Sequence, residues 1–75
     1  MTELIREATR EGRRVAIIRC YDGNGETIVE AQLTPMRGGD PVDRGPYRFP
    51  TATDAFRFVQ EALLALQYLG CAVQQ

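Results

Sequence analysis

Residues 51–70, TATDAFRFVQEALLALQYLG, have the pattern of one long amphipathic helix. Thr51 or Thr53 can cap its start, since a hydroxyl there accepts a hydrogen bond from a free N–H group of the first turn. Gly70 can end the helix, because glycine enters the left-handed conformation without a Cβ clash. The sequence therefore predicts a helix over residues 51–69.

The apolar residues of this helix fall on one broad arc, at roughly 100° per residue. An arc of this kind needs a surface to cover, and the rest of the chain has to supply it. We expect Phe56 and Leu63 to be among the most buried side chains of the helix. The residues of the arc are Ala55, Phe56, Val59, Ala62, Leu63, Leu66 and Leu69.

The covered surface is predicted to be a β-hairpin. Residues 13–21 and 26–34 are rich in β-branched side chains, and DGNG separates them. A type I′ turn at Asn24 and Gly25 fixes the register, because that turn requires positive φ at both positions. It places six side chains on the helix side and Arg19 opposite Glu30 on the other side. The six are Ala16, Ile18, Cys20, Val29, Ala31 and Leu33.

The flanking segments are assigned more loosely. Residues 2–11 are expected to form a short helix within a segment 1–12 that is either docked or frayed, capped by Thr2 and ended by Gly12. Residues 35–46, rich in proline and glycine, are expected to form a mobile loop. Tyr47–Phe49 could add an edge strand and Cys71–Val73 a terminal strand, which would extend the hairpin to three or four strands.

These elements predict a single α+β domain over residues 1–75. An antiparallel hairpin packs on one long C-terminal helix, and a short N-terminal helix accompanies them. No apolar run approaches the roughly 20 residues that a membrane span needs, and the acidic N-terminus is unlike a signal peptide. We therefore expect a cytoplasmic location and no membrane contact.

The composition points away from catalysis. The chain has no histidine, which is the commonest general base and metal ligand. Cys20 and Cys71 match no zinc or redox spacing, and we expect them to be reduced thiols. No nucleophile–base pair and no cofactor motif can be written from these residues. We expect a protein that is not an enzyme and that holds neither a cofactor nor a metal ion.

An alternative function is nucleic-acid binding. The five arginines of the first strand and the loop could follow a phosphate backbone, and Tyr47 and Phe49 could stack on bases. The net charge of −1 argues against it, because the domain has no bulk attraction for polyanions. The candidate contacts are Arg13, Arg14, Arg37, Arg44 and Arg48.

The favoured function follows from the back of the long helix. Leu64 and Tyr68 lie one turn apart on the side away from the apolar arc, with Phe58 at its edge. The N-terminal helix could cover them through Leu4 and Ile5, a second copy of the chain could do so, or another protein could. We expect a small cytoplasmic module that acts through protein contacts, as a homodimer or with another protein.

Overall fold

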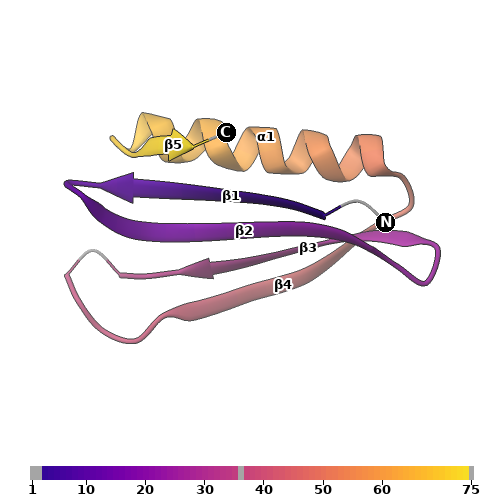
Figure 1. The fold of residues 1–75 in the computed structure, drawn as a ribbon, viewed down its shortest axis with the longest axis horizontal. Coiled ribbons are helices and arrows are strands. Elements are labelled where there is room, and N and C mark those ends of the chain that lie inside the picture. The colour runs from indigo at the N-terminus through magenta and orange to yellow at the C-terminus, as the bar shows by residue number, and fades with distance from the viewer. Residues whose placement is uncertain (1–2, 36, 75) are drawn as a thin grey trace.

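The computed structural model describes residues 3–35 and 37–74 and has an α+β fold (Figure 1). A five-stranded antiparallel sheet has the strand order β4-β3-β2-β1-β5, and one C-terminal helix packs on one of its faces. The helix α1 connects β4 to β5, the strands at the two edges of the sheet. The elements are β1 Glu3–Arg10, β2 Arg13–Gly23, β3 Glu26–Leu33, β4 Val42–Phe49, α1 Ala52–Tyr68 and β5 Ala72–Gln74.

The β2–β3 hairpin has the predicted register. Asn24 and Gly25 have φ values of 52° and 79°, the two positive values that a type I′ turn requires. Cys20 is opposite Val29, and the other expected pairs follow in step. Ile18, Cys20 and Val29 are buried under α1, while Ala31 and Leu33 are half-buried.

The helix α1 begins and ends as its sequence predicts. Thr51, rather than Thr53, is the N-cap, and its side chain accepts a hydrogen bond of 3.2 Å from the backbone N–H of Asp54. At the other end Gly70 has φ of 90°, and the N–H of Cys71 donates to the carbonyl of Leu66. This bond and the one from Gly70 to Gln67 satisfy carbonyls that the helix end would otherwise leave free.

The buried face of α1 differs in part from the predicted arc. Leu63 is 4% exposed, as expected, together with Ala55 and Val59. The prediction for Phe56 was wrong, because its side chain is 38% exposed. Leu69 is also outside the core at 60% exposure.

The face is shifted because Phe58 packs on β4. Its ring centroid lies 5.2 Å from that of Tyr47 and 5.3 Å from that of Phe49. Tilted aromatic pairs at such distances are favourable beyond the area that they bury. The helix therefore turns Phe58 toward the sheet, and Phe56 lies at the opposite flank of the buried face.

The predicted N-terminal helix was wrong, because residues 3–10 form strand β1. This strand pairs with β2, and Leu4 and Ala8 face α1 while Ile5 faces away from it. Glu11 and Gly12 connect β1 to β2 with φ of 55° and 78°, so this connection also has positive φ at both residues. A ten-residue helix would need docking to persist, whereas strand pairing satisfies the backbone directly. Met1 and the expected cap Thr2 lie outside the described residues.

The segment predicted as a loop is shorter than expected. Strand β4 begins at Val42, and Tyr47–Phe49 join the sheet at its edge as predicted. Two residues, Gly45 and Pro46, lie opposite Glu30 alone, so β4 bulges there. A bulge accepts a proline, since the missing N–H interrupts no regular ladder. Of the predicted loop, 35 and 37–41 are the described residues that lie outside the strands, and the mobility of this loop stays a prediction.

The C-terminal strand was also predicted, to within one residue. β5 pairs with β1 and places Val73 opposite Ala8. Cys71 lies in a second apolar cluster with Ala8 and Ala16, apart from the cluster that contains Cys20. Both cysteines are free and buried.

We expect Leu63→Ala to lower the free energy of unfolding by about 2–5 kcal/mol, because it leaves a cavity between α1 and the sheet. Phe56→Ala removes a larger side chain but should cost less, since Phe56 already contacts solvent. Urea unfolding of both variants measures the difference. A larger loss for Phe56→Ala would contradict the observed rotation of the helix.

Candidate functional site

The face of the sheet that points away from α1 is not covered by any element among residues 3–35 and 37–74. Strand alternation brings alternate side chains to this outer face, most of them polar. The apolar members are Ile5, Ile17 and Ile28, of which Ile5 is 49% exposed and Ile28 only 6%. The polar members include Glu3, Glu7, Arg19, Tyr21, Glu30, Gln32, Asp43 and Arg48.

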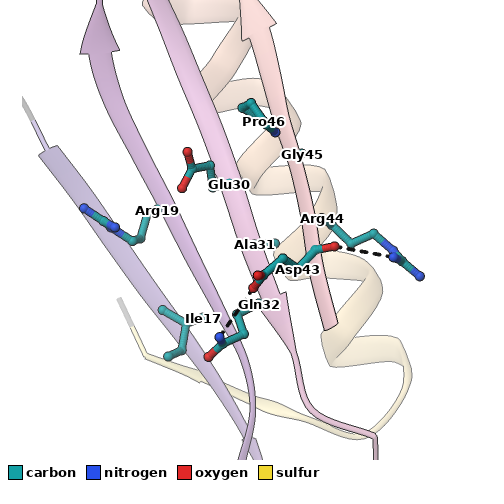
Figure 2. Close-up of a pocket in the computed structure, with 9 residues that line it drawn as sticks. All are labelled: Ile17, Arg19, Glu30, Ala31, Gln32, Asp43, Arg44, Gly45 and Pro46. Carbon is teal, nitrogen blue, oxygen red and sulfur yellow. Dashed lines mark hydrogen bonds between the residues drawn. The ribbon is translucent and has the colours of Figure 1, made fainter. Parts of the chain in front are cut away.

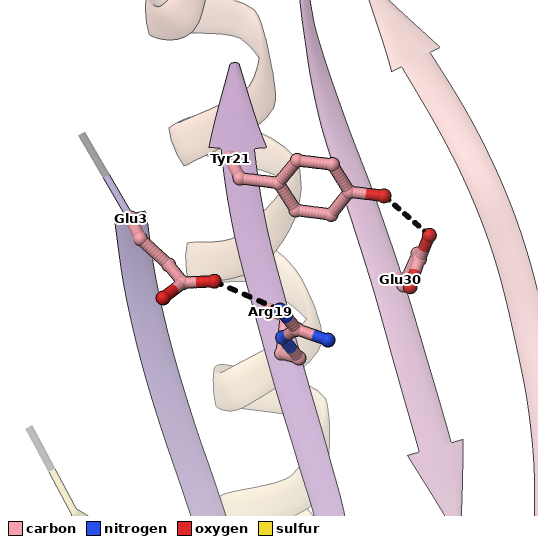
Figure 3. A network of polar contacts seen from close by, with 4 residues as sticks. All are labelled: Glu3, Arg19, Tyr21 and Glu30. Carbon is pink, nitrogen blue, oxygen red and sulfur yellow. Dashed lines mark hydrogen bonds and ion pairs between the residues drawn. The ribbon is translucent and has the colours of Figure 1, made fainter. Parts of the chain in front are cut away.

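A polar network crosses the outer face from β1 to β3 (Figure 3). Arg19 lies opposite Glu30 in the register, as predicted, but its guanidinium group donates to the carboxylate of Glu3 at 2.9 Å. The same guanidinium lies 5.7 Å from the ring centroid of Tyr21, and the Tyr21 hydroxyl donates to Glu30. The network therefore links three neighbouring strands on their solvent side.

The pKa values of two of these groups are shifted by their partners. The hydrogen bond from Tyr21 to Glu30 raises the pKa of the phenol, because the neutral form is the donor. The hydrogen bond and the charge of Glu3 raise the pKa of Arg19. Both shifts strengthen the protonation states present at neutral pH, so neither group is prepared to transfer a proton there.

A hollow of about 480 Å3 lies beside this network, next to the bulge of β4 (Figure 2). Arg19 and Glu30 line one part of it, and Gln32 and Asp43, joined by a hydrogen bond of 3.4 Å, line another. Gly45 shapes the rim, because a Cβ there would lie 2.9 Å from the carbonyl oxygen of Val29. Polar groups that bond one another in this way are typical of the solvated face of an antiparallel sheet.

The five arginines selected from the sequence do not lie on one face. Arg13 and Arg14 are at the start of β2, and Arg14 forms an ion pair with Glu7 at 3.2 Å. The bulge in β4 separates Arg44, opposite Ala31 on the side of α1, from Arg48, opposite Ile28 on the outer side.

The remaining nucleic-acid candidates also lie apart from one another. Arg48 forms an ion pair with Glu26 at 3.6 Å, and Arg37 is exposed in the loop before β4. Tyr47 and Phe49, the candidates for base stacking, pack instead against Phe58. A strand of nucleic acid would therefore have to contact separate parts of the domain to reach all of them.

The back of α1 carries the predicted partner residues Leu64 and Tyr68. They are 51% and 84% exposed, and no element among residues 3–35 and 37–74 covers them. Phe58, the third residue of the predicted interface, lies between α1 and β4 instead. A hollow of about 200 Å3 lies beside Leu64, mostly toward the N-terminal end of α1, and sequence reasoning did not anticipate it. Arg57, Gln60, Glu61, Leu63, Leu64 and Gln67 line it.

Residues 3–35 and 37–74 contain neither a metal-binding cluster nor a helix that could span a membrane. No three side chains of His, Cys, Asp or Glu within residues 3–35 and 37–74 gather closely enough to hold a metal ion. The same residues contain no helix with the length and apolar character that crossing a bilayer requires. Burial raises the pKa of the Cys20 thiol, which disfavours the reactive thiolate.

Comparisons of the chain with protein-family models, with curated proteins and with solved structures gave no match. The outer sheet face and the back of α1, which no element among residues 3–35 and 37–74 covers, are the surfaces on which a function can rest.

We expect the phenol of Tyr21 to ionise above the ordinary pKa of about 10, and Glu30→Gln to bring the pKa back toward that value. The raised folded-state pKa means that the hydrogen bond stabilises the fold fully below about pH 10. That stabilisation is lost as the pH rises through the folded-state pKa. Ultraviolet titration of the phenolate signal measures the shift.

Tyr21→Phe serves as the control, because it identifies which of the three tyrosine signals belongs to Tyr21. A Tyr21 pKa that does not change in Glu30→Gln would show that the two side chains are not bonded in solution.

Proposed function

We propose that this domain is a small non-enzymatic module that acts through protein contacts and binds a second copy of itself through the back of α1. One observation carries the proposal: Leu64 and Tyr68 are exposed on the side of α1 opposite the sheet. The N-terminal segment was the alternative cover within the chain. It lies in the sheet as β1, so Leu4 packs in the core and Ile5 faces the outer side.

The physical reason for association is the apolar area that these side chains leave in water. Burial contributes roughly 25 cal/mol per Å2 of apolar surface, and a tyrosine side chain alone can bury on the order of 150 Å2. Tyr68 also suits an interface, because its ring can be covered while its hydroxyl stays at a wet rim. A second copy presents the same residues and so offers a matching apolar surface.

The outer sheet face gives weaker support for a docking surface. Its charged groups already bond one another, as in the pairs Glu3–Arg19 and Tyr21–Glu30. A partner on this face would have to replace the water around those groups at a cost in free energy. Leu64 and Tyr68 have no comparable polar bonds to lose.

The alternative function, nucleic-acid binding through the arginines, also has weaker support. The arginines are divided between the start of β2, the loop and the two sides of β4. The proposal includes a cytoplasmic location, which suits the two free thiols because that compartment keeps cysteines reduced.

We expect the wild-type protein to sediment at twice the 8.4 kDa of one chain at concentrations of tens of micromolar. Leu64→Glu should give a folded monomer, because the interface would then have to bury a carboxylate. Ile5→Glu is the matched control, since Ile5 is equally exposed at 49% but lies on the outer sheet face. A wild-type monomer under these conditions would overturn the proposal, and dissociation by Ile5→Glu alone would move the interface to the sheet.

A further inference from the structure

Building on the proposed self-association, we infer that two copies pair with their α1 helices antiparallel, about a two-fold axis at Leu64. Tyr68 of each copy then enters the hollow beside Leu64 of the other. Both features are present on one helix: Tyr68 projects at 84% exposure, and the hollow holds about 200 Å3. The relative orientation of the two copies and the contact between their side chains are what the proposed function leaves open.

The spacing of these features along α1 favours the antiparallel arrangement. Tyr68 lies four residues after Leu64, about 6 Å along the axis at a rise of roughly 1.5 Å per residue. The hollow extends along α1 from Arg57 to Gln67, and Gln60, Glu61 and Arg57 line the part of it on the other side of Leu64. A two-fold axis at Leu64, perpendicular to the helices, places Tyr68 of one copy at the same height along the helix axis as Gln60 of the other copy. Each copy therefore inserts one side chain and receives one.

The charges on the helix back agree with this arrangement. In a parallel pair every residue faces its own equivalent, so Glu61 would oppose Glu61 and Arg57 would oppose Arg57. In the antiparallel pair Glu61 is level with Gln67 of the second copy along the helix axis, and no like charges on this face are level with each other. Like charges in contact are unfavourable, and the antiparallel pair avoids them.

The hollow has suitable chemistry for a tyrosine. Arg57 can place its guanidinium against the inserted ring, a favourable contact for a cation and an aromatic face. Its charge is partly balanced by Asp54, 3.9 Å away on the same helix. Gln60 and Glu61 offer acceptors for the hydroxyl, and Leu64 covers the apolar side of the ring. Contact through one helix is small for a protein interface, so we expect a reversible dimer rather than a permanent one.

Cysteine cross-linking tests the axis. Helices that pack at about 8–10 Å bring facing Cα atoms to about 4–5 Å, which a disulfide can span. Leu64→Cys should therefore form a disulfide-linked dimer under mild oxidation. Glu61→Cys should not link to itself, because its equivalents are about 9 Å apart along the antiparallel helices. Gln60→Cys should link to Gln67→Cys when these two variants are mixed, because the two positions share a flank and lie about 1.5 Å apart along the antiparallel helices.

Wild type is the control for these reactions, since Cys20 and Cys71 are only 1% and 7% exposed and should not cross-link. Tyr68→Ala should weaken dimer formation by about tenfold or more without changing the circular dichroism, because the variant lacks the side chain that enters the hollow. Thr53→Ala, on the same side of α1 but away from the axis, should leave association unchanged.

The outcomes separate this inference from the proposed function. A wild-type monomer would overturn both. If the wild type is a dimer and Glu61→Cys links to itself, the two helices are parallel. If the wild type is a dimer and Leu64→Cys does not link, the two-fold axis does not lie at Leu64. Either result would overturn the inference while the proposed self-association stood.

Discussion

The two-residue turn at Asn24 and Gly25 is the constraint on which the rest of the structure depends. Its positive φ values fix which residues of β2 and β3 face each other, and a slip of one residue would put the apolar side chains of the two strands on opposite faces of the sheet. With this register Cys20 and Val29 share one face, and α1 can bury Val59 and Leu63 against them. Arg19 and Glu30 are directed to the other face by the same alternation. The turn therefore determines both the core and the polar outer surface.

The hairpin and the helix could be predicted because their signals are local. A turn motif, β-branched residues and a capped amphipathic pattern each act within about 20 residues. β1 could not be recognised in this way, since Leu4, Ile5 and Ala8 fit one helix stripe as well as a strand. Its strand state depends on pairing with β2 on one side and with β5, about 65 residues away, on the other. Glu11 and Gly12 were the one local signal of a turn between two strands. A glycine at this position can equally end a helix.

The candidate site was predictable to the same extent. The position of Leu64 on the back of α1 follows from helical periodicity alone, at about 180° from Ala55. Phe58 was placed at the edge of that surface from its position on the helix, because the sequence does not show that Tyr47 and Phe49 of the expected edge strand lie beside it. The bond between Glu3 and Arg19 depends on β1, so it could not be found while residues 2–11 were assigned to a helix. The hollow beside Leu64 depends on side-chain conformations, for which the sequence offers no pattern.

The edges of the sheet bear on how two copies can meet. An exposed edge strand is the commonest route to unwanted association, because its backbone groups can pair with another chain. Here β4 carries a bulge at Gly45 and Pro46, and its arginines project to both sides. At the other edge β5 spans only three residues, from Ala72 to Gln74, and pairs with Glu7–Thr9 of β1, so this edge is divided between β5 and the start of β1. These features disfavour edge-to-edge pairing, in which a new strand would continue the sheet. The back of α1 has no such protection, and there the apolar surface is presented by side chains on a rigid helix. Self-association through α1 can therefore be specific and reversible, whereas association through the edges would be neither.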